Sequence, residues 1–312
     1  MYLIFIATLA VTGPIFLIVV IGLLLARIGF LDDHFNQVAA RLVFSICLPV
    51  LLFSTIVKID LSTAVDVSTI NFSLLATVVT FAISWLAALF MQPAQDRGVI
   101  VQGAFRSNLG VIGLALCANA YGAPGLALAS LLMASLTVSY NILSVFILSF
   151  YSNQDFQWRR VLLDILRNPL IVAIVLAVIV AGLKVPVPPI LTSAGDYIGA
   201  MALPLALLGT GASMSMKTLR NSTGATSVVI ILKTCLLPGV VVLMALLAGI
   251  EGMYLGVLFL LFVSPTASAS YAMVKAIGAN DRLAANLVMT TTLVSILTCS
   301  IGLFLLKMFA LA

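Results

Sequence analysis

The chain has 312 residues, of which 63% are hydrophobic and only 8% are charged, and its mean hydropathy is +1.27. This composition leaves too little polar surface for a soluble globular protein and is typical of a polytopic membrane protein. The net charge of +5 does not indicate nucleic-acid binding, because the chain has no basic run and no stripe that mixes basic and aromatic residues.

The charged residues fall in short clusters, separated by apolar runs of about the length that crosses a bilayer. The first run, Leu3 to Ala26, has no basic residue before it, so we expect an uncleaved first span rather than a signal peptide. Further runs follow at Leu42 to Val57, Thr69 to Met91, Leu170 to Leu183, Tyr197 to Met216, Asn221 to Ile250, Gly252 to Val274 and Leu283 to Leu306.

The uncharged stretch from Ser107 to Gln154 is too long for one span, since as a single helix it would measure roughly 70 Å. The sequence Asn119-Ala-Tyr-Gly-Ala-Pro-Gly125 is a favourable place for the chain to turn back. This stretch therefore supplies two spans. We predict an all-α polytopic membrane protein with ten transmembrane helices.

The basic residues predict how these spans are oriented. One side of the membrane holds the bases in the loops after spans one, three, five, seven and nine: Arg27, Arg41, Arg97, Arg159, Arg160, Arg167, Lys217, Arg220, Lys275 and Arg282. The other side holds only Lys58, Lys184 and Lys307. Because basic loops stay in the cytoplasm, both termini are expected on the extracytoplasmic side.

The two halves of the sequence resemble each other at a nearly constant spacing. Pro14 and Pro169 are 155 residues apart, and so are the Leu-Pro pairs at Leu48 and Leu203. Residues 120–123 and 131–139 resemble residues 276–279 and 287–295 at a spacing of 156. Two units of five spans, residues 1–152 and 153–312, would have opposite orientations, so we predict an inverted repeat.

Two stretches look like interrupted membrane helices. Phe105 to Tyr121 carries an arginine, an asparagine and two glycines, and Val263 to Ile277 mixes Pro265 with a row of hydroxyls. Both are fourth in their unit. Interrupted backbone is tolerated in a membrane only where protein or a water-filled cavity covers it, so we predict that the fourth and ninth helices are broken and cross near the midplane at a solute site.

Several short motifs also resemble a known family. They are Gly13-Pro-Ile-Phe-Leu-Ile-Val-Val-Ile-Gly22, Gly29-Phe-Leu31, Leu48-Pro-Val-Leu-Leu52, Asn108-Leu-Gly-Val-Ile-Gly113, Lys233 with Pro238, and Pro265 with Gly278-Ala-Asn-Asp281. In order and spacing they resemble the auxin efflux carrier family, which includes plant PIN-FORMED carriers and bacterial malonate-type transporters. One departure is Ala115, where the family often has proline.

The resemblance implies the fold of bile acid sodium symporters, with spans 1, 2, 6 and 7 as a scaffold and spans 3–5 and 8–10 as a mobile transport part. It also implies a small organic anion as the solute and a bacterial inner membrane as the location. It leaves open a homodimer formed through the scaffold helices.

Two basic residues lie inside the predicted spans. Arg106 is either an interfacial arginine that reaches the headgroups or a counter-charge for an anionic solute, since a guanidinium matches a carboxylate and a charge in the membrane is costly. Lys233 lies about a third of the way into span eight. Snorkelling of Lys233 to the interface is the favoured interpretation, and solute binding is the alternative.

The other candidate site residues are polar or small. Asn108 offers an amide to a carboxylate, at the position where the resemblance places a binding asparagine, and Gly110 and Gly113 permit close approach of the backbone to a ligand. The glycines can instead serve close helix packing. The row around Pro265 can bind the solute or hydrogen-bond its own helix, and it comprises Ser264, Thr266, Ser268 and Ser270.

No catalytic, metal-binding or nucleotide-binding motif appears, and the four cysteines lie singly. No cofactor is therefore expected. No span interior holds a carboxylate, so we expect a uniporter, or coupling through an ion held by carbonyls and hydroxyls. The sequence favours a secondary transporter of a small organic anion by alternating access of an elevator type, over a sodium-coupled symporter or a non-transporting membrane sensor.

The predicted topology can be tested with reporter fusions. A C-terminal alkaline phosphatase fusion should be active and a C-terminal green fluorescent protein fusion should be dark, because both termini are expected outside the cytoplasm. The opposite pattern would contradict the topology and the inverted repeat together.

Overall fold

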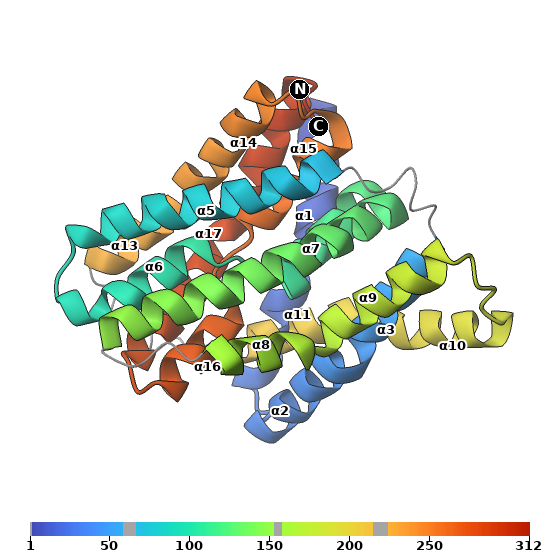
Figure 1. Cartoon of the computed structure of the whole chain (residues 1–312), viewed down its shortest axis with the longest axis horizontal. Coiled ribbons are helices and arrows are strands. Elements are labelled where there is room, and N and C mark those ends of the chain that lie inside the picture. Colours follow the sequence, from blue (N-terminus) through green and yellow to red (C-terminus); the bar gives the residue numbers. More distant parts are fainter. Residues whose placement is uncertain (1, 59–66, 153–157, 215–223) are drawn as a thin grey trace.

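The computed structural model describes residues 2–58, 67–152, 158–214 and 224–312, and all regular elements within these ranges are helices (Figure 1). By length and composition, 7 of its helical segments can cross a membrane: Ile4–Arg27, Asp33–Val57, Ser68–Leu89, Leu109–Ser152, Pro189–Ala212, Gly224–Leu247 and Asp281–Met308. Pro169–Gly182 and Gly252–Val263 are shorter apolar helices. An all-α polytopic membrane protein is thus confirmed.

The first half of the chain forms α1 (Tyr2–Arg27), α2 (Asp33–Leu42), η1 (Val43–Cys47), α3 (Leu48–Val57), α5 (Val67–Leu89), η2 (Ala94–Asp96), α6 (Arg97–Phe105), η3 (Leu109–Gly113) and α7 (Leu114–Ser152). The second half forms α8 (Trp158–Leu166), α9 (Pro169–Gly182), α10 (Pro189–Ala200), α11 (Ala202–Ala212), α13 (Gly224–Ile231), η4 (Leu232–Leu236), α14 (Leu237–Leu247), α15 (Gly252–Val263), α16 (Ser268–Ala276) and α17 (Asp281–Met308).

Two long helical runs contain a π-helical turn directly before a Leu-Pro pair. η1 joins α2 to α3 at Leu48-Pro49, and η4 joins α13 to α14 at Leu237-Pro238. Proline has no N–H to donate, and its ring clashes with the carbonyl one turn earlier. A wider turn at this point lets the helix continue past the proline.

α7 consists of two helices joined at a kink. Gly122 has φ 63° and ψ −149°, a conformation that glycine adopts far more readily than any residue with a Cβ atom. Gly122 lies in the middle of the predicted turn at residues 119–125. The stretch that is too long for one span therefore bends where the sequence indicated.

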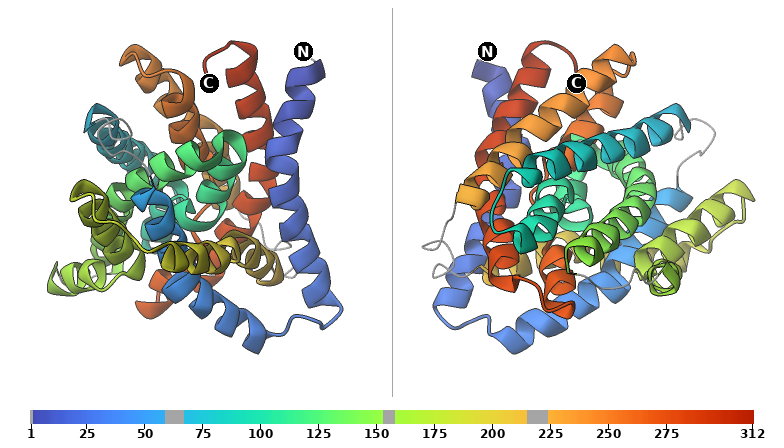
Figure 2. Two further views of the ribbon diagram at one scale, coloured as in Figure 1. Left: turned by 90° about the vertical axis from the view of Figure 1, so that its right-hand side faces the viewer. Right: turned by 60° about the vertical axis from the view of Figure 1, so that its left-hand side comes forward.

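The two termini lie at the same end of the molecule, as both views in Figure 2 show. The last residues are fixed to the start of α15, because the N–H of Gly252 donates to the carbonyl of Leu311 (2.8 Å). An even number of membrane crossings would bring the two ends together in this way.

The first helix packs closely along α11, and α3 packs against both α9 and α10. Glycines permit the approach of α1 to α11: Gly22 lies against the backbone of Leu208, and Gly211 lies against the backbone of Val19. Without a hydrophobic driving force between helices in lipid, such close backbone contact is a main source of helix association.

Replacing Gly211 with alanine should destabilise the protein, because the added Cβ would overlap the carbonyl of Val19 and force α1 away from α11. The expected cost is about 1–3 kcal/mol, measured as a lower thermal unfolding midpoint in detergent. Gly209→Ala is the matched control, since a Cβ at that position of α11 meets no atom within 4 Å. Equal midpoints for the two variants would contradict this account of the contact.

Candidate functional site

Two helices are interrupted near the centre of the molecule. α6 ends at Phe105, and Arg106 (φ −80°, ψ 107°) and Asn108 (φ −80°, ψ 72°) have non-helical backbone. α15 ends at Val263, and Ser264 (φ −53°, ψ 142°) and Ala267 (φ −63°, ψ 133°) are extended. At the second break Pro265 explains the end of the helix, because proline lacks a donor and disfavours helical backbone in the residue before it.

The two breaks pair with each other as a minimal antiparallel ladder. The N–H of Asn108 donates to the carbonyl of Pro265 (2.7 Å), and the N–H of Ala267 donates to the carbonyl of Arg106 (3.1 Å). Ser107 and Thr266 face each other across this bridge. We call residues 106–108 together with residues 264–267 the crossing. Each break lies inside a predicted interruption, the first within Phe105–Tyr121 and the second within Val263–Ile277.

The two facing hydroxyls each bond the end of the opposite helix. Ser107 Oγ donates to the carbonyl of Phe262 in α15 (3.2 Å), and Thr266 Oγ1 donates to the carbonyl of Gly103 in α6 (2.6 Å). Both carbonyls lie in the last turn of a helix, where the intrahelical partner is missing. Thr266 therefore has a structural role at the crossing, and its N–H is taken by Thr291 Oγ1 (3.1 Å).

Arg106 is enclosed, with 7% of its surface exposed. Its Nη1 donates to the carbonyl of Tyr140 (3.3 Å) and to Ser144 Oγ (3.0 Å), and its Nη2 donates to Asn141 Oδ1 (2.8 Å). Nη1 also lies 3.3 Å from Met273 Sδ. Among the described residues no carboxylate pairs with this guanidinium. The interpretation of Arg106 as an interfacial residue does not fit this enclosure.

Lys233 is buried as well, with 1% of its surface exposed. Its Nζ donates to Ser107 Oγ and to the carbonyl of Phe262 (3.1 Å). The favoured sequence interpretation, a lysine that snorkels to the interface, is wrong. η4 directs the side chain toward the crossing instead of along the helix to the headgroups.

A cavity of about 460 Å³ adjoins one side of the crossing. Asn108 lies on its wall. Gly110 is beside it, and a Cβ at Gly110 would meet only side-chain atoms at ordinary contact distance. The polar and near-crossing residues on the wall are Arg106, Ser107, Asn108, Thr137, Tyr140, Asn141, Arg167, Asn168, Ala267, Ser268 and Ala269.

Apart from Ser268, the remaining predicted site residues do not line this cavity. Gly113 packs against Leu261 and Ser264, and Ser264 Oγ donates to the carbonyl of Leu260 (2.7 Å) within its own helix. Pro265 contributes its carbonyl to the bridge. Ser270 is buried, and its hydroxyl has no partner among the described residues. Of the row around Pro265, only Ser268 reaches the cavity, at the start of α16.

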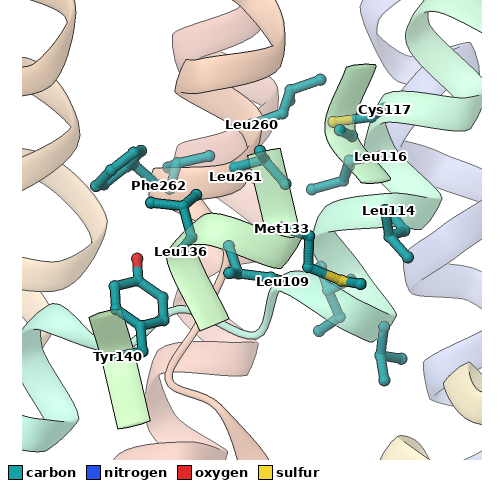
Figure 3. Close-up of a cluster of buried hydrophobic side chains, with 14 of the residues drawn as sticks. Leu109, Leu114, Leu116, Cys117, Met133, Leu136, Tyr140, Leu260, Leu261 and Phe262 are labelled. Carbon is teal, nitrogen blue, oxygen red and sulfur yellow. The ribbon is translucent and has the colours of Figure 1, made fainter. Parts of the chain in front are cut away.

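Sequence reasoning missed the wall that α7 contributes. Thr137, Tyr140, Asn141 and Ser144 occur at the spacing of one helix face in a largely apolar span, and this periodicity was the available signal. Figure 3 shows Tyr140 among the buried side chains, with its phenol oxygen turned toward the side where Phe262 lies. That oxygen has no hydrogen-bond partner among the described residues.

Two other cavities lie near α16. One of about 330 Å³ shares Ser268 with the cavity at the crossing and extends to Thr210 and Ser213 of the α11 end. A larger one of about 710 Å³ is lined by Asp96, Asn280, Asp281 and Arg282, at the loops. Size alone would favour the last, but none of the residues of the crossing lines it. The buried guanidinium of Arg106 and the amide of Asn108 are both at the cavity of about 460 Å³ beside the crossing.

Comparison with known families gives one match. The family model described as membrane transport protein matches residues 9–303, which is nearly the whole chain. No curated protein matches the chain.

The hydroxyl of Thr266 should be needed to hold the crossing. Thr266→Val keeps the shape but leaves the carbonyl of Gly103 without this donor, at an expected cost of about 1–3 kcal/mol. Thr290→Val in α17 is the control, because that buried hydroxyl bonds Asn286 within its own helix (2.7 Å). Thermal unfolding in detergent should give a lower midpoint for Thr266→Val than for Thr290→Val, and the reverse order would refute this role.

Proposed function

Because the chain belongs to the auxin efflux carrier family of membrane transport proteins, we propose that it is a secondary transporter of a small organic anion, a mono- or dicarboxylate, that binds beside the crossing. Membership confirms the resemblance found in the sequence motifs, and it identifies a transporter rather than an enzyme.

The observation that carries the proposal is the buried charge of Arg106. A cation in the membrane interior is costly, by at least ~2.5 kcal/mol at a helix centre, and it is usually retained for a functional reason. All the protein partners of Arg106 are neutral: a carbonyl, a hydroxyl and an amide oxygen. They orient the guanidinium without neutralising it. A carboxylate in the adjoining cavity would supply the missing negative charge and a charge-assisted hydrogen bond.

Extended backbone explains how Arg106 and Asn108 can serve one solute. On a helix, residues two apart point about 200° away from each other. In a strand, residues two apart point to the same face, and the residue between them points to the opposite face. The hydroxyl of Ser107 accordingly bonds Phe262 and Lys233, and Ser107, Arg106 and Asn108 all contribute to the cavity wall.

The start of α16 adds a third source of positive potential. Ala267, Ser268 and Ala269 lie on the cavity wall, so the first peptide N–H groups of this helix are near the solute volume. The N-terminus of a helix carries partial positive charge and favours anions. A volume of about 460 Å³ falls within the range of small-molecule pockets and suits a compact carboxylate.

The finer architecture is also part of the proposal. We take the ten predicted spans to be α1, α2 to α3, α5, α6 to the kink of α7, the rest of α7, α9, α10 to α11, α13 to α14, α15 to α16, and α17. Ser107 donates to a carbonyl of α15 and Thr266 donates to a carbonyl of α6. This reciprocal arrangement supports an inverted repeat whose two-fold axis passes through the crossing. Spans 1, 2, 6 and 7 would form the scaffold, against which the other spans move.

Uptake into proteoliposomes tests the function directly. A panel of radiolabelled mono- and dicarboxylates should yield at least one solute that accumulates above the level in empty liposomes. Uptake of none of them, by protein that is folded and correctly inserted, would overturn the proposal.

The residues can be tested with the best solute of that panel. Arg106→Gln should weaken its apparent affinity about 10- to 100-fold, because a hydrogen bond to a charged group is lost. Arg106→Lys should retain part of the activity, since it keeps the charge but loses the planar fork. Asn108→Ala should weaken affinity about 3- to 10-fold.

Arg97→Gln is the matched control, because Arg97 begins the same helix, bonds the carbonyl of Met91 (2.9 Å) and lies outside the cavity. If Arg106→Gln transports the solute with unchanged affinity, the guanidinium only supports the fold, and the site rests on Asn108 and the start of α16.

A further inference from the structure

The ammonium group of Lys233 lies where the fold brings together oxygen atoms that can bind a cation. Its two partners are a hydroxyl, Ser107 Oγ, and a carbonyl, that of Phe262. Ser107 Oγ also donates to this same carbonyl (3.2 Å), so the three groups form one closed cluster. Ser107 also forms part of the wall of the solute cavity, whereas Lys233 and Phe262 do not line it.

The carbonyl of Phe262 is available because α15 breaks. In a continuous helix it would accept the N–H of residue 266, four positions later. Here that N–H donates to Thr291 Oγ1 instead (3.1 Å). The break therefore leaves a carbonyl free at the C-terminal end of α15, where the helix dipole concentrates negative charge and favours a cation.

Such a set of ligands is one that a metal cation could also use. Hydroxyl and carbonyl oxygens are ligands of hard cations, and unwound carbonyls at broken membrane helices hold coupling ions in some transporters. Within the described part of the chain, no carboxylate pairs with Lys233. The amino group of Lys233, with 1% of its surface exposed, takes the place that such a cation would occupy.

We propose that Lys233 is a positioning residue that acts as a covalently attached cation at the crossing, in the place of a dissociable alkali ion. By bonding Ser107 and Phe262 it fixes the extended segment whose neighbouring side chains, Arg106 and Asn108, face the solute cavity. The carrier consequently requires no Na⁺. The effect on uptake rests on the proposed transport function, whereas the cation site itself does not.

The cation site can be tested by restoring the missing atoms. Lys233→Ala removes a propylammonium group, so n-propylammonium should bind the vacated space and raise the thermal unfolding midpoint of this variant by several degrees in detergent. 1-Propanol, of similar size but neutral, should give no such rise. Wild type and Lys233→Met, whose side chains fill the space, should respond to neither compound.

Lys184→Ala is the control for loss of a lysine, since Lys184 is exposed. A rise for Lys233→Ala no larger than that of wild type would overturn the proposal, whatever the protein transports. The thermal unfolding measurement needs no transported solute. A negative result there is therefore distinguishable from a failure to find carboxylate uptake.

Uptake provides the second arm. Wild-type uptake should be the same in Na⁺ and in N-methylglucamine, and Lys233→Met should lower it about tenfold. Lys233→Ala should show the same loss and regain uptake when n-propylammonium is added. Wild-type uptake that falls about tenfold without Na⁺, or full uptake by Lys233→Met, would each refute the proposal. Both of these measurements remain decisive if Lys233→Ala does not fold.

Discussion

The hydrogen bonds between the two broken helices are the constraint on which the rest of the site depends. A break frees backbone donors and acceptors, and in the interior of a membrane protein these must find partners within the chain. Here each break supplies partners for the other, through the bridge of Asn108 with Pro265 and Ala267 with Arg106. Neither interruption would be stable alone, so the two halves of the chain must meet at this point for either to keep its shape.

The extended backbone of the bridge also gives neighbouring side chains different partners. Because side chains alternate along extended backbone, one segment places Arg106 and Asn108 at the cavity while the hydroxyl of Ser107 bonds Lys233. An anion bound in the cavity would thus contact other side chains of this segment than the one that bonds Lys233. A helix could not separate them so sharply over so short a length.

The sequence predicted the fold better than it predicted the contacts of the site. The glycine at the α7 kink and Pro265 each have a local physical effect, so the bend and the break follow from the local sequence. The environment of Lys233 does not follow from the local sequence. Hydropathy gives the depth of a lysine in the membrane, but the face on which it lies depends on the rotation of the helix, which the π-helical turn before Pro238 changes.

The partners of Arg106 were hidden for a related reason. Asn141 and Ser144 come from α7, and their distance from Arg106 in the sequence gives no hint of contact. Only the periodic polar face of α7 signals that this helix lines something other than lipid.

The alternation of side chains at the crossing has a consequence for how such a chain can diverge over time. Substitutions that alter the size or polarity of the cavity wall can accumulate singly, and each would adjust the choice of solute. A single inserted or deleted residue between Phe105 and Leu109 would instead exchange the two faces, turning a hydroxyl toward the solute and a guanidinium toward the ammonium of Lys233. The length of this segment should therefore be held constant in lineages whose side chains there vary freely.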